Sequence, residues 1–231
     1  YQKALKIQLH VLRDNHPEVA ISYNNIGSVY NSLGDYEKAL KFCQKALKIR
    51  LQVLGENHPD VAISYNNIGS VYDSLGDNEK ALEYYQKALT TRLQVFEENH
   101  PDVANSYNNI GALYLKLKDY EETLKYYQKT LTIRLQIFGN NHSYVATSYN
   151  NIGIAYKNLE NYEKALEFYQ KALKIRLQVL GENHSDVASC YNNIGYVYDN
   201  LGKYEKALES FQKNLKIKLN VLGENHLEVA K

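Results

Sequence analysis

Apolar and small residues recur along this chain with the spacing of an amphipathic helix. Between residues 58 and 76 they occupy Val61, Ala62, Tyr65, Ile68, Gly69, Tyr72 and Leu75. These positions fall on one face of an α-helix and do not fit the alternation of a β-strand. Asn57 is placed to cap this helix, with Asp60 in capping-box register, and Gly76 supplies a left-handed stop. The pattern predicts a first helix that ends at Gly76.

A second helix is predicted directly after the first. In the preceding copy of the pattern it starts at Asp35 and runs to Leu54, where Gly55 ends it. The small residues Ala39 and Ala46 on its apolar face allow close packing against another helix. Lys118 and Glu160 stand where other copies have glycine between the two helices, so those turns must avoid or tolerate a left-handed residue.

The helix pair recurs with a constant period of 42 residues, marked by Asn-Asn-Ile at 24–26, 66–68, 108–110, 150–152 and 192–194. Complete repeats span 16–57, 58–99, 100–141, 142–183 and 184–225. Residues 1–15 match only a second helix and 226–231 only the start of a repeat, so we expect a piece of a longer array. No single helix pair buries its own apolar stripe, so the pairs must stack. The sequence predicts an all-α fold: one array forming a right-handed α-solenoid, or superhelix, of stacked antiparallel helix pairs.

The residues kept in each repeat resemble the tetratricopeptide repeat family. They are the tyrosines at 23, 65, 107, 149 and 191, the glycine four residues on, the tyrosine three beyond it, and the later Ala-Leu pairs. The longer period, with Ala-Leu-Lys-Ile-Arg-Leu-Gln-Val-Leu-Gly-Glu-Asn-His-Pro-Asp-Val-Ala at 46–62, is similar to the repeat of kinesin light chains. The resemblance implies a scaffold for protein interactions, and, if it extends to function, a motor–cargo adaptor.

In tetratricopeptide arrays one side of each first helix lines a concave groove, and Ile21, Asn25, Ser28 and Ser32 are placed on that side. The predicted peptide-binding residues are Asn25, Asn67, Asn109, Asn151, Asn193, Ser28, Ser70, Lys116, Asn158, Tyr196 and Asn200. An asparagine amide can donate to and accept from a peptide backbone, so the Asn25 series could hold an extended chain. The alternative is that this series only bonds adjacent helices. The Asn24 series, nearer the core, is assigned to bonds between helices.

Two further series have chemistry to consider. The histidines precede each first helix, one per repeat (His16, His58, His100, His142, His184 and His226), so they form a row without convergence. Since zinc needs three or four ligands around one point, we expect turn packing and capping, and no metal. Arg50, Arg92, Arg134 and Arg176, with Lys218, lie on the apolar side of the second helices. Their expected partners are the helix C-terminus and the acids after the histidines, such as Asp60 and Asp102; a basic strip along the groove edge is the alternative.

Composition narrows the function further. The net charge of +1 gives no sign of a nucleic-acid binder, and no apolar run approaches the length of a membrane span. Cys43 and Cys190 lie in different repeats, which predicts unpaired, buried thiols and a reducing, cytoplasmic location. No nucleophile–base pair or phosphate-binding loop stands out, so we expect neither an enzyme nor a cofactor.

The leading hypothesis is therefore a non-catalytic scaffold that holds an extended peptide or helix of a partner protein in the groove. Two alternatives stay open. One is a structural spacer or rod that self-associates through its truncated ends. The other is a docking or sensor arm of a larger enzyme or signalling protein.

Overall fold

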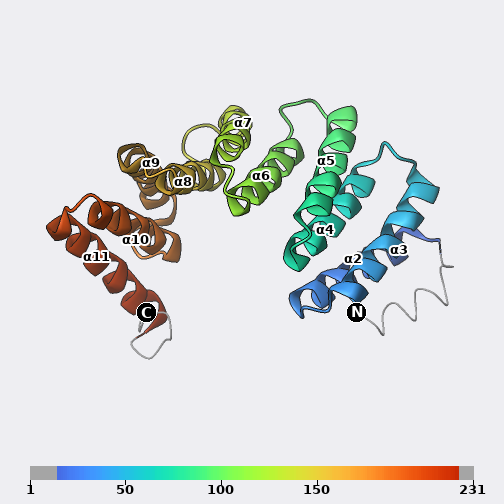
Figure 1. Ribbon diagram of the computed structural model, residues 1–231, viewed down its shortest axis with the longest axis horizontal. Coiled ribbons are helices and arrows are strands. Elements are labelled where there is room, and N and C mark those ends of the chain that lie inside the picture. Colours follow the sequence, from blue (N-terminus) through green and yellow to red (C-terminus); the bar gives the residue numbers. More distant parts are fainter. Residues whose placement is uncertain (1–14, 224–231) are drawn as a thin grey trace. The chain divides into compact units, whose positions relative to one another are not determined.

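The computed structural model describes residues 15–223, and these form ten α-helices without a β-strand (Figure 1). The first helices of the repeats are α2 (Pro17–Ser32), α4 (Pro59–Leu75), α6 (Pro101–Lys116), α8 (Ser143–Asn158) and α10 (Ser185–Asn200). The second helices are α3 (Tyr36–Leu54), α5 (Asn78–Val95), α7 (Tyr120–Phe138), α9 (Tyr162–Leu180) and α11 (Tyr204–Leu222). The prediction of an all-α fold built from helix pairs is confirmed. The expected helices at 1–15 and 226–231 lie largely or wholly outside the described residues.

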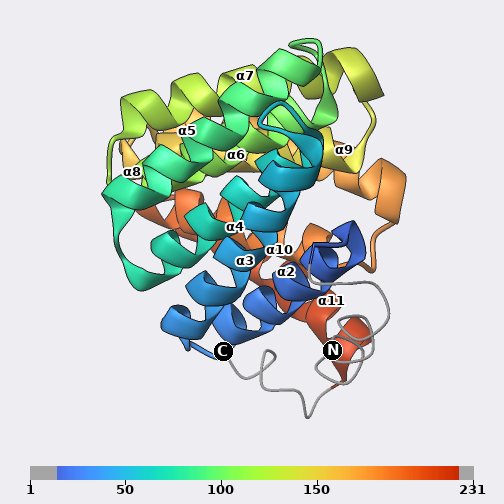
Figure 2. The same ribbon diagram turned by 90° about the vertical axis from the view of Figure 1, so that its right-hand side faces the viewer.

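The helices gather into two compact units, Tyr1–Leu117 (unit 1) and Lys118–Lys231 (unit 2). Within unit 1, α2 pairs with α3 and α4 with α5, while α3 packs on α4 and α5 on α6. Within unit 2, α8 pairs with α9 and α10 with α11, while α7 packs on α8 and α9 on α10. Figures 1 and 2 both show α4 lying along α5. Each unit is thus a stack in which a second helix lies between the first helices of two successive repeats.

The first helices begin one residue later than the sequence predicted. His58, not Asn57, is the N-cap of α4, and its Nδ1 accepts a hydrogen bond from the backbone N–H of Asp60 at 3.1 Å. The Nδ1 atoms of four other histidines accept the equivalent hydrogen bond from the backbone N–H two residues later. These are His16, His100, His142 and His184. The capping-box assignment to Asn57 is therefore wrong, because the histidine ring itself accepts from the exposed N–H of the first turn. The capping role expected of the histidines is confirmed at these five positions, and His226 lies outside the described residues.

The turns at Lys118 and Glu160 tolerate a left-handed residue. Lys118 has φ of 62° and Glu160 φ of 58°, close to the 68° of Gly202 at the equivalent position. A side chain in this conformation brings Cβ close to the backbone carbonyl, at a cost of about 1–2 kcal/mol. The turn thus keeps the geometry of the repeat at the expense of local strain.

We expect Glu160→Gly and Lys118→Gly each to stabilise the protein by about 0.5–1 kcal/mol. Glycine removes the left-handed strain, and its greater entropy in the unfolded chain offsets only part of that gain. The midpoint of urea unfolding checks this, with Gly202→Glu as the matched control that should lower the midpoint. Unchanged or lower midpoints for both glycine variants would contradict the strain.

Glycines in the first helices allow an aromatic ring to pack directly against the helix backbone. A Cβ built on Gly69 would lie 2.8 Å from a ring carbon of Tyr85, and one on Gly153 would lie 2.7 Å from the ring of Tyr169. Tyr169 is fully buried, and this burial raises the pKa of its phenol. The close approach of first and second helices therefore depends on the missing side chain.

The arginines of the second helices join successive repeats. Nη1 of Arg50 donates to the main-chain carbonyl of Asp60 at 2.8 Å and to Oγ of Ser64 at 2.9 Å. The same two bonds form from Arg92 to Asp102 and Ser106, and from Arg134 to Tyr144 and Ser148. Arg176 donates to the carbonyl of Asp186 and to Sγ of Cys190, both at 3.1 Å.

These arginines are buried, with exposed fractions of 5–7%, and burial lowers the pKa values of Arg50, Arg92 and Arg134. A structural role is confirmed, and the alternative of a basic strip along the groove edge is wrong. The acceptors of the hydrogen bonds described above are main-chain carbonyls, serine hydroxyls and one cysteine sulfur, in place of the carboxylates that the sequence suggested. For Lys218, the corresponding partner in the next repeat lies outside the described residues.

Both cysteines are free and buried, as predicted. Burial raises the pKa of Cys43 to about 11, so its thiol stays protonated near neutral pH.

Candidate functional site

The predicted peptide-binding residues lie on one side of the first helices, which we call the first-helix face. In unit 1, Asn25, Ser28 and Lys116 are exposed, while Asn67, Ser70 and Asn109 are half-buried. In unit 2, Asn158, Tyr196 and Asn200 are exposed, while Asn151 and Asn193 are half-buried. All eleven residues therefore have some access to solvent on their own unit.

Two members of the Asn25 series form bonds between adjacent first helices. Nδ2 of Asn109 donates to Oδ1 of Asn66 at 2.7 Å, and Nδ2 of Asn193 donates to Oδ1 of Asn150 at 3.0 Å. Asn66 and Asn150 belong to the Asn24 series, whose predicted role between helices is thereby confirmed at these two positions. These bonds are the alternative that the sequence left open for Asn109 and Asn193. Contact between the series and a ligand stays a prediction.

Asn158 and Asn200 are held against their own helices. Nδ2 of Asn158 donates to the carbonyl of Ile154 at 2.8 Å, and Nδ2 of Asn200 donates to that of Tyr196 at 2.7 Å. These bonds fix the direction of each side chain and leave the amide oxygen as an acceptor.

A pocket opens on this face in unit 2. It has a volume of about 230 Å³ and is lined by Lys157, Tyr162, Tyr196 and Asn200. Tyr196 is 50% exposed, and its ring meets Phe211 edge-on at 5.2 Å between centroids. Tyr196 and Asn200 were predicted from the sequence, whereas Lys157 and Tyr162 were missed. The signal for Lys157 was present, because its equivalents Asn31, Asp73, Leu115 and Asp199 vary as strongly as the positions predicted to select side chains.

The corresponding place in unit 1 holds an ion pair. Eighty-four residues earlier, or two periods, Asp73 replaces Lys157 and Lys116 replaces Asn200. Nζ of Lys116 lies 2.7 Å from Oδ1 of Asp73 and 2.6 Å from its main-chain oxygen. Lys116, predicted to contact a ligand, thus already has an internal partner.

Lys157 has no such partner within residues 15–223, where no ion pair forms to its ammonium group. It is half-buried beside two phenol groups that can donate hydrogen bonds. A positive charge and convergent donors favour a ligand that carries a negative charge. The pocket of unit 2 therefore has the chemistry of an anion site, and its counterpart in unit 1 is internally neutralised.

Comparisons with known proteins agree with the fold of stacked helix pairs. The family model described as "Tetratricopeptide repeat" matches residues 1–42, 18–94, 76–134, 102–178 and 144–220. This chain belongs to the tetratricopeptide repeat family. Members of this family are in general scaffolds for protein interactions. A search of curated proteins found no match.

Several solved structures share the fold. BtubC (BKLC) from P. vanneervenii is 25% identical, with a TM-score of 0.82 over 97% of this chain and 89% of that one. A putative kinesin light chain with nearly identical repeats, from Podosopora anserina, is 17% identical, with a TM-score of 0.77 over 89% and 97% of the two chains. The apo form of RapI is 22% identical, with a TM-score of 0.74 over 87% and 70%. The last two similarities show the fold alone.

None of the described helices combines the length and the apolar character that crossing a membrane requires. Between residues 15 and 223, no three His, Cys, Asp or Glu side chains gather in a way that could hold a metal ion.

Proposed function

We propose that this chain is a non-catalytic scaffold that holds an extended segment of a partner protein against the first-helix face. The observation that supports this most is the pocket at Lys157, Tyr162, Tyr196 and Asn200. It combines an exposed aromatic ring, an amide oxygen and an ammonium group that has no ion-pair partner among residues 15–223. Such a set recognises an acidic side chain or another carboxylate on a peptide.

The rest of the first-helix face would bind the peptide backbone and would not select among peptide sequences. The amide oxygens of Asn109 and Asn193 can accept from a peptide N–H while their nitrogens hold the neighbouring helix. Asn25, which is exposed, can use its whole amide. Selection would then fall to the positions that differ among repeats, of which Lys157 and Tyr196 are the most distinctive in unit 2.

Selection of peptides from a random display library tests this function. We expect selected peptides to carry an acidic residue and to bind Lys157→Gln at least about tenfold more weakly, a loss of about 1.4 kcal/mol. Replacing the acidic residue of the peptide by its amide should cause the same loss, without adding to that of Lys157→Gln.

Lys174→Gln is the matched control, because Lys174 is exposed on the second helix α9 and should leave affinity unchanged. Selected peptides that bind wild type and Lys157→Gln equally well would overturn the assignment of the pocket.

A motor–cargo adaptor is a finer form of the same proposal, and the resemblance of residues 46–62 to kinesin light chain repeats supports it. Self-association through the ends stays a prediction, as does a role as the arm of a larger enzyme.

A further inference from the structure

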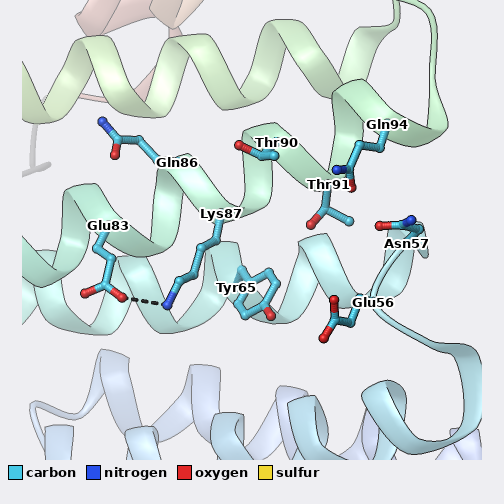
Figure 3. Close-up of a pocket in the computed structure, with 9 residues that line it drawn as sticks. All are labelled: Glu56, Asn57, Tyr65, Glu83, Gln86, Lys87, Thr90, Thr91 and Gln94. Atoms are coloured by element: carbon cyan, nitrogen blue, oxygen red, sulfur yellow. Dashed lines mark hydrogen bonds and ion pairs between the residues drawn. The ribbon is translucent and has the colours of Figure 1, made fainter.

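A polar crevice in unit 1 lies on a different side of α4 from the first-helix face. It is lined by Glu56 and Asn57 of the α3–α4 turn, by Tyr65 of α4, and by α5 between Glu83 and Gln94, and it has a volume of about 470 Å³ (Figure 3). Tyr65 and Asn67 are two residues apart, so they are about 200° apart around the helix axis. The crevice is therefore separate from the face proposed above to hold a peptide.

The crevice lies along α5, beside α4 and the turn that precedes α4. Both α3 and α5 pack on α4, but they do not pack extensively on one another. Tyr65 of α4 contributes the one aromatic ring to the lining. In Figure 3 the carboxylate of Glu83 lies on one side of this ring and that of Glu56 on the other.

The lining carries more negative than positive charge. Nζ of Lys87 is bound to Oε1 of Glu83 at 2.6 Å, so these two charges offset each other. Glu56 is exposed and forms no ion pair with any residue between 15 and 223. The remaining polar lining consists of amides and hydroxyls with acceptor oxygens, those of Asn57, Gln86, Thr90, Thr91 and Gln94.

Unit 2 has a crevice at the equivalent place, three periods later, with a volume of about 370 Å³. It keeps the glutamate, asparagine, tyrosine and lysine as Glu182, Asn183, Tyr191 and Lys213. However, Lys216 replaces Thr90 and Ile217 replaces Thr91. The two crevices thus share four lining residues but differ in charge.

The sequence shows that the negative balance is specific to the crevice at Tyr65. The positions of Glu56, Glu83, Lys87 and Thr90 hold two carboxylates against one ammonium group. One period earlier, the equivalent positions hold one carboxylate against three ammonium groups. One and two periods later they hold one against two, and three periods later they hold two against two.

We propose that the crevice of unit 1 binds an arginine side chain on a basic segment of a partner protein. A guanidinium group has five donors in one plane, which suits several acceptors around an aromatic ring, and it binds over such a ring more readily than a hydrated ammonium group. The bound cation neutralises the charge left by Glu56. The scaffold then has a second contact surface with a charge preference opposite to that of the Lys157 pocket.

Binding of a fluorescein-labelled Gly-Ser peptide that carries arginines tests this. We expect the full chain to bind it, Glu56→Gln to weaken binding about threefold, and Thr90→Lys to weaken it at least about tenfold, because a like charge enters the crevice. The same peptide with citrulline in place of arginine keeps the shape and loses the charge. It should bind the wild-type protein as weakly as the arginine peptide binds Thr90→Lys.

Thr132→Lys is the matched control, since Thr132 is the exposed equivalent of Thr90 in the third repeat. It changes the net charge of the protein equally and should leave the affinity for the arginine peptide unchanged. Thr90 and Glu56 are also exposed, so neither variant should shift the unfolding midpoint. The proposal fails if the arginine peptide does not bind, if citrulline binds as well, or if Thr90→Lys and Thr132→Lys behave alike.

Discussion

Replacing Arg92 by alanine should lower the free energy of unfolding by about 3 kcal/mol. Arg92 is 6% exposed, and its guanidinium group bridges α5 to α6 through the carbonyl of Asp102 at 3.1 Å and Oγ of Ser106 at 2.6 Å. Truncation removes this donor from the buried hydroxyl of Ser106 and from the partly buried carbonyl of Asp102, and it opens a cavity. The loss of a charge-assisted hydrogen bond in such a place costs about 1.5–3 kcal/mol before the cavity is counted. Urea unfolding followed by circular dichroism measures the loss.

A double-mutant cycle with Ser106→Ala separates the bridge from general damage. We expect a coupling energy of about 1 kcal/mol or more between the two positions. Arg176→Ala should cost less, because the sulfur of Cys190 is a weaker acceptor than the serine hydroxyl. A cost below about 1 kcal/mol for Arg92→Ala, or no coupling with Ser106, would show that the arginines do not join the repeats energetically.

Gly153→Ala should destabilise unit 2 by about 1–2 kcal/mol. The new Cβ would lie 2.7 Å from two ring carbons of Tyr169, which is fully buried. Overpacking of this kind typically costs about 1–3 kcal/mol, and the gain in helix propensity from alanine returns less than about 1 kcal/mol. Thermal and urea unfolding both report the change.

Two comparisons test the steric cause. In the first repeat a Cβ on Gly27 would lie 2.6 Å from Sγ of Cys43, which is also buried, so Gly27→Ala should cost about as much. Combining Gly153→Ala with Tyr169→Leu should cost less than the sum of the two single changes, because the smaller residue makes room for the methyl group. Strict additivity would contradict the clash.

The fold of helix pairs could be predicted from the sequence because the local signals for helix starts and stops recur with the 42-residue period. Helix periodicity, a second helix starting at Asp35, and Gly76 as a stop all predict the same helix pair, and the structure has it, with Asp35 as the N-cap of α3. The error at Asn57 arose because a histidine ring is an uncommon cap, so the preference for asparagine pointed to the neighbouring residue.

The candidate site was harder to predict from the sequence because its properties depend on distances between side chains of different repeats. A helical wheel places Asn109 at the surface, but only the structure shows that its nitrogen reaches Asn66 on the previous first helix. Likewise, Lys116 and Lys157 look alike as isolated lysines, yet one faces Asp73 and the other has no counter-charge among residues 15–223. Partners 43 residues apart in the chain cannot be identified from the pattern of either helix alone.

Photo-crosslinking of a selected acidic peptide tests the proposed function most directly. A photoreactive group beside the acidic residue of the peptide should link to unit 2 near Lys157 and Tyr196, on α8 and α10, and the link should be lost in Lys157→Gln. Crosslinks confined to the second helices, or links at α8 and α10 that persist unchanged in Lys157→Gln, would contradict the account.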